Sequence, residues 1–121
     1  MAPEPVFRAR VYRVDPSRLP AFTEFFLTYL LPVQERHGAR LVGRWSSVNG
    51  ERVVAVWMYV SQEEAQRIQD AVRDDPQGEQ ARAVREASEP FYLSYEEMML
   101  SSTVDMSRTL LGPARPGSAE A

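Results

Sequence analysis

The sequence contains no cysteine, and this absence excludes several kinds of site. The chain can have no disulfide framework, no thiol nucleophile and no thiolate metal site. Histidine occurs once, at His37, so a metal site built from several histidines is excluded as well. Carboxylates at a metal-ligand spacing are also missing. We therefore expect neither a metal nor another cofactor.

Lysine is absent too, so all 14 positively charged side chains are arginines, a composition typical of a high-GC bacterium. The 17 acidic side chains outnumber them and give a net charge of -3, whereas a nucleic-acid-binding protein should show a basic face. No apolar run reaches the ~18 residues of a membrane span, and the N-terminal residues do not resemble a signal peptide. We expect a cytoplasmic protein that binds neither nucleic acid nor membranes.

The length and the C-terminal composition predict one domain followed by a tail. A chain of 121 residues can bury a single core, which we expect within residues 1–106. Residues 107–121 contain two prolines, two glycines and no aromatic residue. Because such a segment has too few apolar side chains to offset its ordering entropy, we predict a disordered tail there.

The segment Leu41–Val60 predicts a β-hairpin. Two runs rich in valine, tryptophan and tyrosine flank Asn49-Gly50, a pair that favours the two positive φ angles of a type I′ turn. A two-residue turn would pair Ser46 with Val53, Arg44 with Ala55 and Val42 with Trp57.

This register divides the hairpin side chains between two faces. One face would carry Val42, Arg44, Ser46, Val53, Ala55, Trp57 and Tyr59. The other would carry Leu41, Gly43, Trp45, Val54, Val56, Met58 and Val60. The second set is almost wholly apolar, so we expect the helices to pack on it and Trp45 to lie in the core. A bulge in place of the tight turn would reverse the assignment of Trp45.

Alternation and spacing predict the elements around the hairpin. A strand over Val6–Val14 would place Phe7, Ala9 and Val11 opposite Arg8, Arg10 and Tyr12. A helix should follow over Arg18–His37, with a kink at Pro32 and a C-cap at Gly38.

After the hairpin, three further elements are expected. Ser61 and Glu64 form a capping box that opens a second helix. Asp75-Pro76 interrupts that helix, and Asp75 should cap a third helical piece that ends before Pro90. The last strand is predicted over Phe91–Leu100.

The resulting order is β-α-β-β-α-β. It predicts an α+β ferredoxin-like subunit with a four-stranded antiparallel sheet and helices on one face. The uncovered face would expose Tyr12, Val42, Trp57 and Tyr59, an apolar patch that soluble monomers avoid. We therefore expect a symmetric homodimer in which two sheets meet face to face and enclose a cavity.

Four short motifs carry a family resemblance. Arg10-Val11-Tyr12, LPVQERHG at residues 31–38, LVGRW at residues 41–45 and VWMY at residues 56–59 resemble, in this order, the NIPSNAP family within the dimeric α/β-barrel group. The resemblance implies a ferredoxin-like homodimer with a barrel-like cavity. Relatives in the wider group include cofactor-free monooxygenases, cyclases, isomerases and heme-handling enzymes. The chain departs from the pattern at Arg8, where the family commonly has glutamate, and at Ala55, where it often has histidine.

The candidate site lies on the sheet face that we expect to line this cavity. Arg10, Tyr12, Tyr59 and Glu96 are the candidate catalytic residues, and Arg8, Arg44, Val42 and Trp57 the candidate substrate-binding residues. Alternation allows Glu96 or Glu97 to face the arginines, and placing Tyr95 and Met99 against the helices selects Glu96. The alternative is that some arginines lie at the rim, solvated or paired across the dimer. His37 is expected to complement the dipole at a helix C-terminus.

Two functional classes fit these residues. The first is a cofactor-independent enzyme of the cyclase, isomerase or monooxygenase type, acting on an aromatic or polyketide-like, partly anionic small molecule. The second is a non-catalytic dimeric module that binds a metabolite or another protein.

Overall fold

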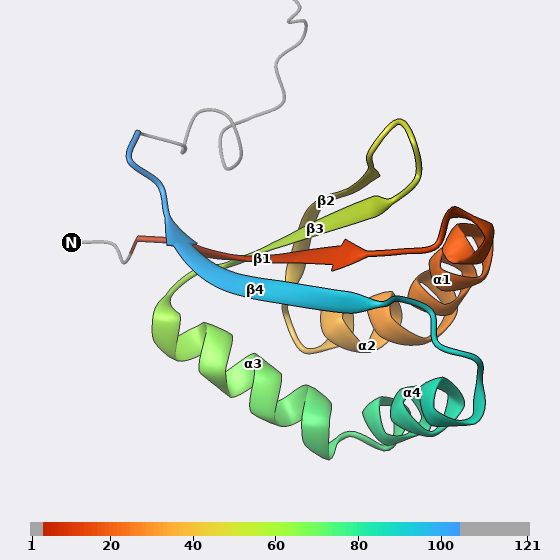
Figure 1. The fold of residues 1–121 in the computed structure, drawn as a ribbon. Coiled ribbons are helices and arrows are strands. Elements are labelled where there is room, and N and C mark those ends of the chain that lie inside the picture. Colours follow the sequence, from red (N-terminus) through yellow and green to blue (C-terminus); the bar gives the residue numbers. More distant parts are fainter. Residues whose placement is uncertain (1–3, 105–121) are drawn as a thin grey trace, which may run out of the picture.

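The computed structural model describes residues 4–104 and consists of one antiparallel sheet with helices on one side (Figure 1). The strands are β1 (Val6–Arg13), β2 (Arg40–Ser46), β3 (Arg52–Tyr59) and β4 (Ser94–Ser101). The helical segments are η1 (Pro16–Arg18), α1 (Leu19–Phe25), η2 (Phe26–Leu30), α2 (Leu31–Arg36), α3 (Gln62–Asp74) and α4 (Pro76–Ala87). The tail predicted over residues 107–121 lies outside the described residues.

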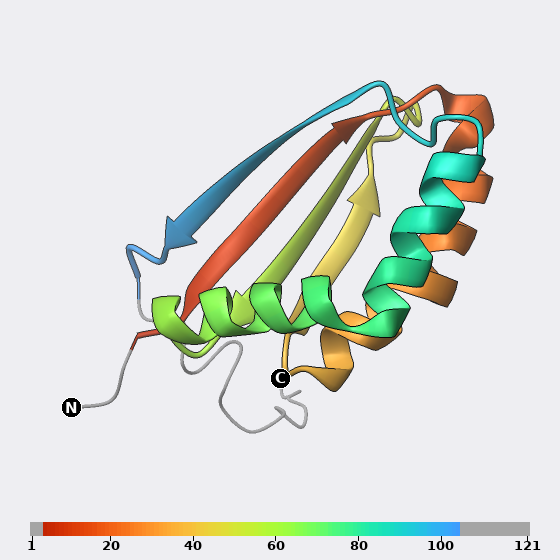
Figure 2. The ribbon, with the colours of Figure 1, turned by 90° about the horizontal axis from the view of Figure 1, so that it is seen from below.

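The sheet has the strand order β2-β3-β1-β4, and all three neighbouring pairs are antiparallel. Figures 1 and 2 show all the helices on the same side of the sheet, with α3 running across the strands near one end and α4 running beside the α1, η2 and α2 region. The β-α-β-β-α-β order and the one-sided cover confirm the predicted α+β ferredoxin-like subunit. None of the described helices is both long and apolar enough to span a bilayer.

The first helical region accommodates Pro32 through a wider turn. Between α1 and α2 the segment η2 is a π-helix, in which the Leu31 N–H bonds to the Phe26 carbonyl five residues earlier. Pro32 therefore falls in the first turn of α2, where its missing N–H costs little. The irregularity that the sequence predicts at Pro32 thus takes the form of a π-helical segment just before it, and the helical region ends beside Gly38 at φ 108°.

Caps divide the second helical region as the sequence predicts. The Ser61 side chain accepts a hydrogen bond from the Glu64 N–H and opens α3, and the Asp75 side chain accepts one from the Gln77 N–H and opens α4. Gly78, in the first turn of α4, lies directly against α3. A Cβ atom at Gly78 would stand 2.0 Å from the Val72 carbonyl oxygen, so only glycine allows the two helices to approach this closely.

The hairpin turn differs from the prediction. In residues 4–104, φ is positive only at Gly38 and Gly50, so Asn49 does not adopt the conformation that a type I′ turn requires. Instead the Gly50 N–H bonds to the Ser47 carbonyl, and the Asn49 side chain accepts a bond from the Glu51 N–H. The pairs Ser46–Val53 and Arg44–Ala55 are as predicted.

Past Arg44 the register shifts. A bulge between Leu41 and Gly43 places Leu41, and not Val42, opposite Trp57. Leu41 thereby joins the face of Trp57 and packs against the core, whereas Val42 is exposed.

The predicted assignment of the two sheet faces is wrong. The helices cover the face that holds Tyr12, Val53, Trp57 and Tyr59, all of which are buried in two clusters with helical side chains. Trp45 was expected in the core but points to the uncovered face and is 53% exposed. The reason is that both faces are apolar, so the count of apolar residues could not distinguish them, while the large aromatic side chains fill the space between sheet and helices.

Candidate functional site

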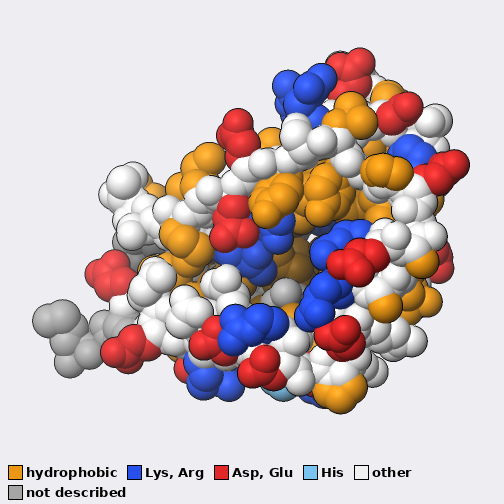
Figure 3. All heavy atoms as spheres, turned by 60° about the horizontal axis from the view of Figure 1, so that its bottom comes forward, with side chains coloured by type: hydrophobic (Ala, Val, Ile, Leu, Met, Phe, Trp, Pro, Cys, Tyr) orange, Lys and Arg blue, Asp and Glu red, His pale blue; other side chains and the backbone are white. Residues whose placement is uncertain are grey.

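A cavity opens between the sheet and the helices (Figure 3). Its inner pocket, of about 90 Å³, is lined from the sheet by Arg8, Arg10, Tyr12, Ala55 and Trp57, and from the other elements by Phe22, Phe25, Phe26, Leu30, Gln34, Arg85 and Tyr92. Figure 3 shows arginine side chains around a hollow that has hydrophobic side chains at its base. The inner pocket therefore combines flat apolar walls with positive charge.

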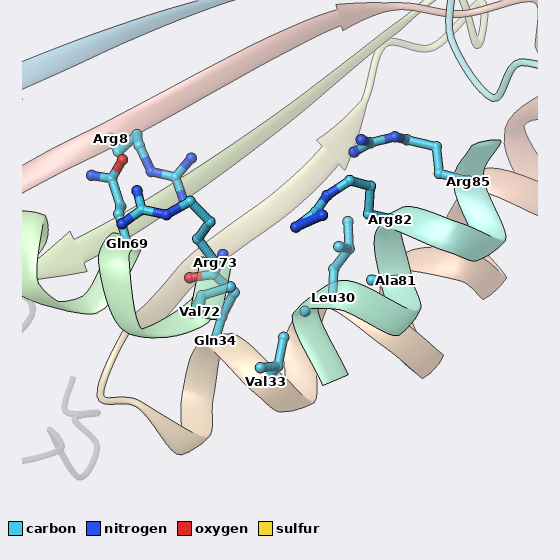
Figure 4. Close-up of a pocket in the computed structure, with 11 residues that line it drawn as sticks. Arg8, Leu30, Val33, Gln34, Gln69, Val72, Arg73, Ala81, Arg82 and Arg85 are labelled. Carbon is cyan, nitrogen blue, oxygen red and sulfur yellow. The ribbon is translucent and has the colours of Figure 1, made fainter. Parts of the chain in front are cut away.

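An outer pocket of about 260 Å³ adjoins it and extends between α2, α3 and α4 (Figure 4). The two pockets share Arg8, Leu30, Gln34 and Arg85. Arg73, Arg82 and Gln69 belong to the outer pocket alone. Among residues 4–104, no aspartate or glutamate lines either pocket, although the chain as a whole carries a net charge of -3.

Arg8 is fixed at the centre of this cavity. It lies on β1 opposite Trp57 and is only 5% exposed. Its Nε donates a 3.0 Å hydrogen bond to the Tyr59 hydroxyl, and its Nη1 donates a 3.3 Å bond to Glu97 Oε1. A buried guanidinium needs such partners because removing it from water costs several kcal/mol.

Arg10 lies two residues further along β1, on the same face. Its Nε is 3.4 Å from Glu97 Oε1 but is buried without a well-aligned hydrogen bond in the described part of the chain. The guanidinium carbon lies 4.1 Å from the centre of the Tyr95 ring and 5.5 Å from that of Tyr12. Arg10 is thus held by rings and keeps donor capacity for a ligand.

Arg44 reaches the same region from β2. Its guanidinium carbon lies over two aromatic rings, 4.8 Å from the centre of Phe22 and 4.7 Å from that of Phe26. Nη1 donates to Thr23 Oγ1 at 2.9 Å, while Nε and Nη2 are buried and lack a partner among residues 4–104. Burial lowers the pKa of Arg44 from its ordinary value, yet a guanidinium stays charged near neutral pH.

Tyr12 supplies a hydroxyl to the inner pocket. Its ring packs edge-on against Phe22, with centroids 5.0 Å apart, and lies 4.9 Å from the Tyr92 ring. Burial raises the pKa of Tyr12, an effect that the positive charge of Arg10 partly opposes. The hydroxyl therefore stays protonated at neutral pH and is suited to donate a proton or a hydrogen bond.

The structure brings most of the predicted site residues together, but on the helix-covered side of the sheet. Arg8, Arg10, Tyr12 and Trp57 line the inner pocket, and Arg44 stacks on two of its aromatic walls. Tyr59 is 1% exposed, and its hydroxyl accepts the hydrogen bond from Arg8 Nε. These residues therefore lie around a cavity within one subunit, on the sheet face opposite to the one that is free to meet a second copy, and the face-to-face dimer stays a prediction.

Two predicted site residues lie elsewhere. Glu96 pairs with Val11 on the uncovered face, and it is Glu97, opposite Arg10, that contacts the arginines. The choice of Glu96 failed because Tyr95 and Met99 do face the helices, as expected, but so do the arginines. Val42 lies in the bulge of β2 and is not among the residues that line the two pockets.

Sequence reasoning missed the part of the site that the helices contribute. Arg82 and Arg85 project from α4, Arg73 from α3 and Gln34 from α2 (Figure 4). The spacing of Arg82 and Arg85 places both on one side of a helix, and their position next to buried Ala81 was the available signal.

His37 lies outside both pockets. Its Nε2 is 2.7 Å from Asp75 Oδ2, an interaction between helix ends that fits a structural role. In residues 4–104 no three histidine, aspartate or glutamate side chains are grouped so that they could hold a metal ion.

The fold and the cavity define a ferredoxin-like α+β protein with a cationic, aromatic-walled pocket between sheet and helices. The family model for NIPSNAP matches residues 7–108. The chain belongs to the NIPSNAP family.

Solved structures share the fold. A NIPSNAP family protein from Agrobacterium tumefaciens is 16% identical with a TM-score of 0.71, and the match covers 85% of this chain and 90% of that one. A NIPSNAP domain protein from Burkholderia xenovorans is 23% identical with a TM-score of 0.68, covering 81% and 94%. SnoaB from Streptomyces nogalater, a cofactor-independent oxygenase, is 11% identical with a TM-score of 0.62, covering 85% and 97%. The comparison with curated proteins gave no match.

Proposed function

We propose that the chain is a cofactor-independent enzyme that acts on a flat, mostly apolar small molecule with an anionic edge. The observation that carries this proposal is the set of Arg8, Arg10 and Arg44 on the helix-covered face of the sheet, where only Glu97 contacts any of them as a carboxylate among the described residues. An organic anion would supply the missing negative charge, and the aromatic walls would stack its rings.

The chemistry that suits this arrangement is formation of an enolate or phenolate. Arg10, whose Nε lies 3.4 Å from Glu97 Oε1 but makes no well-aligned hydrogen bond among residues 4–104, would stabilise the developing oxyanion. Glu97, which contacts two arginines of the inner pocket without itself lining it, would accept the proton taken from carbon, and Tyr12, whose burial raises its pKa, would return a proton. Tyr59 then acts as a positioning residue through its hydrogen bond to Arg8.

SnoaB, a cofactor-independent oxygenase, is an example of such an enzyme on this fold, but an identity of 11% carries the fold alone and names no reaction for this chain. An enolate is also an intermediate from which isomerisation, cyclisation or reaction with oxygen can proceed. Enolate formation is therefore the proposed first step, and the structure of the substrate determines which reaction follows it.

One observation favours the alternative of a non-catalytic binding module. Glu97 Oε1 already lies 3.3 Å from Arg8 and 3.4 Å from Arg10, and a carboxylate held by two guanidinium groups is a weak base. In that case the cavity would bind its anion and release it unchanged.

We further propose that the functional unit is a homodimer formed through the uncovered sheet face. This face carries Trp45, Val54, Val56, Met98 and Leu100, of which Trp45, Met98 and Leu100 are exposed. Burying such a surface against a second copy removes apolar area from water while leaving the cavity of each subunit intact.

Binding is tested with 2-naphthoate and its neutral analogue 2-naphthamide by isothermal titration calorimetry. Arg10→Met keeps the length of the side chain and removes its charge. It should weaken 2-naphthoate by roughly 1.5–3 kcal/mol, the range for hydrogen bonds to charged groups, and leave 2-naphthamide nearly unchanged. Arg13→Met, on the exposed end of the same strand, is the control. An equal loss for both ligands would mean that Arg10 supports the fold and does not bind the anion.

Catalysis is tested with 6-carboxy-2-tetralone, which has an anionic edge and an acidic C–H next to its ketone. The protein should accelerate exchange of that proton in D₂O, followed by ¹H NMR, and both Arg10→Met and Glu97→Gln should abolish the acceleration. Binding of the probe without any acceleration would favour the non-catalytic module.

A further inference from the structure

The outer pocket contains more positive charge than one anionic group requires. Four of its lining residues are arginines: Arg8 from β1, Arg73 from α3, and Arg82 and Arg85 from α4. Figure 4 shows these side chains reaching the same space from three elements. The inner pocket already has Arg8, Arg10 and the adjacent Arg44 for the anionic edge of a ligand.

The α4 arginines differ in how their charge is compensated. Arg82 forms a 2.7 Å ion pair with Glu79, three residues earlier on the same helix. Arg85 lines both pockets and forms no ion pair within residues 4–104. Since an exposed i,i+3 pair is worth only a few tenths of a kcal/mol, Arg82 can exchange Glu79 for a ligand at little cost.

Arg73 is compensated more fully. It lies 3.0 Å from Asp70 and 3.5 Å from Asp74, both on α3. It therefore adds less net charge to the outer pocket than Arg85. The unbalanced charge is concentrated at Arg85 and Arg82, on the α4 side.

We propose that the outer pocket is a second anion subsite, centred on Arg82 and Arg85, so that the ligand of this protein carries two oxyanion groups at opposite ends of a flat apolar body. This inference rests on the proposed function, which places the first oxyanion and the rings in the inner pocket. The second group is a carboxylate or a phosphate, since guanidinium groups pair with both in the same fork geometry.

Residues between the two subsites match such a ligand. Leu30 and Gln34 line both pockets, so the connecting passage has one apolar and one amide side chain. An apolar ligand body can pass Leu30 while Gln34 donates or accepts a hydrogen bond at its edge. Neither side chain would repel an anion.

The test uses ligands of one shape. Naphthalene-2,6-dicarboxylate has an oxyanion at each end, 6-(phosphonooxy)-2-naphthoate has a phosphate at one of them, and 6-carbamoyl-2-naphthoate has a single charge. In calorimetry at low ionic strength, both doubly anionic ligands should bind about tenfold or more tightly than the carbamoyl ligand, well above the statistical factor of two for a symmetric diacid. The doubly anionic ligand that binds more tightly shows whether the subsite prefers a carboxylate or a phosphate. Tighter binding of either one than of the carbamoyl ligand supports the second subsite.

The deciding variant is Arg82→Gln combined with Arg85→Gln. It should reduce the advantage of the doubly anionic ligands to about twofold. Because Arg85 also lines the inner pocket, the ratio of the affinities is the reading, and not the affinity of the carbamoyl ligand by itself. Arg13→Gln combined with Arg52→Gln removes the same charge from the exposed ends of β1 and β3 and should keep the full advantage. Arg85→Lys keeps the charge and should retain part of it. Circular dichroism confirms that each variant folds.

The failures are distinguishable. If the carbamoyl ligand binds and depends on Arg10 but the doubly anionic ligands gain nothing, or keep their gain in the α4 variant, the second subsite is overturned and the proposed function stands. If no ligand binds to the unmodified protein, both are overturned.

Discussion

His37 Nε2 lies 2.7 Å from Asp75 Oδ2, and this contact joins the end of α2 to the boundary between α3 and α4. The same Asp75 oxygen pairs with Arg36, while Oδ1 accepts the Gln77 N–H that begins α4. One carboxylate thus caps α4 and ties it to α2.

The first prediction concerns the pH dependence of stability. The pKa of Asp75 lies far below its ordinary 3.8, held there first by Arg36 and then by His37 and the Gln77 N–H. A carboxylate with a lowered folded-state pKa contributes stability above its unfolded pKa and loses it as the pH falls through the folded value. Asp75→Asn should therefore be less stable than the unmodified protein at pH 7, and the difference should shrink between pH 4 and pH 2. Urea unfolding at a series of pH values measures this, and a constant difference would show that the charge of Asp75 does not matter.

A second prediction concerns the packing of α4 on α3. A methyl group at Gly78 would meet the Val72 carbonyl oxygen at 2.0 Å, and a backbone atom cannot move aside as a flexible side chain can. Gly78→Ala should lower the free energy of unfolding by about 1–3 kcal/mol, although alanine is the better helix former. Gln80→Ala, an exposed change on the same helix, should have little effect. Thermal unfolding of the two variants would contradict the argument if Gly78→Ala were as stable as the control.

Local signals predicted the elements well because each depends on a few neighbouring residues. Ser61 and Asp75 cap the helices that they were expected to cap, and Pro32 begins a new helical segment. The alternation in β1 separated Phe7 and Val11 from Arg8 and Arg10, as the pairing with β3 and β4 confirms.

What the sequence could not provide was the side of the sheet on which the helices pack. Alternation defines two faces but not their direction, and here both are apolar. The face with Trp57 is the covered one because aromatic rings reach across to Phe26 on η2, whereas Val54 and Val56 are too short to span that distance. Because the covered face was predicted wrongly, Glu96 was expected beside the arginines and Trp45 in the core, whereas both lie on the uncovered face.

The contribution of the helical arginines to the site could not be predicted from the sequence for a related reason. Arg82 and Arg85 lie far from Arg8 along the chain, and a charge on a helix surface is usually solvated. Only the placement of α4 beside η2, on the helix-covered side of the sheet, brings them to the same cavity (Figure 2).

A third prediction distinguishes Glu97 from Glu96. Glu97 competes with an anionic ligand for Arg8 and Arg10, so Glu97→Gln should bind 2-naphthoate more tightly, by about three- to tenfold. The variant should also unfold at a lower temperature, since it removes a charge partner of buried Arg8. Glu96→Gln makes the same change on the opposite face and should alter neither property. Titration calorimetry measures the affinity and thermal unfolding measures the stability. Equal effects of the two variants would contradict the placement of Glu97 and Glu96 on opposite faces of the sheet.

The last prediction tests the uncovered face as a dimer interface. Val54 lies near the middle of that face, opposite Val11 and Trp45, and is half-buried by its neighbours in the sheet. If two such faces pack together, Val54→Asp would bury a carboxylate without a partner, which costs several kcal/mol per subunit and should turn a micromolar dimer into a monomer. Leu27→Asp introduces the same charge at an exposed leucine in η2 and should leave the dimer intact. Sedimentation velocity reads the assembly, and because the cavity lies within one subunit, monomeric Val54→Asp should still bind 2-naphthoate. A dimer that persists in this variant would place the interface elsewhere, whereas a monomer that no longer binds the anion would show that the second copy completes the pocket.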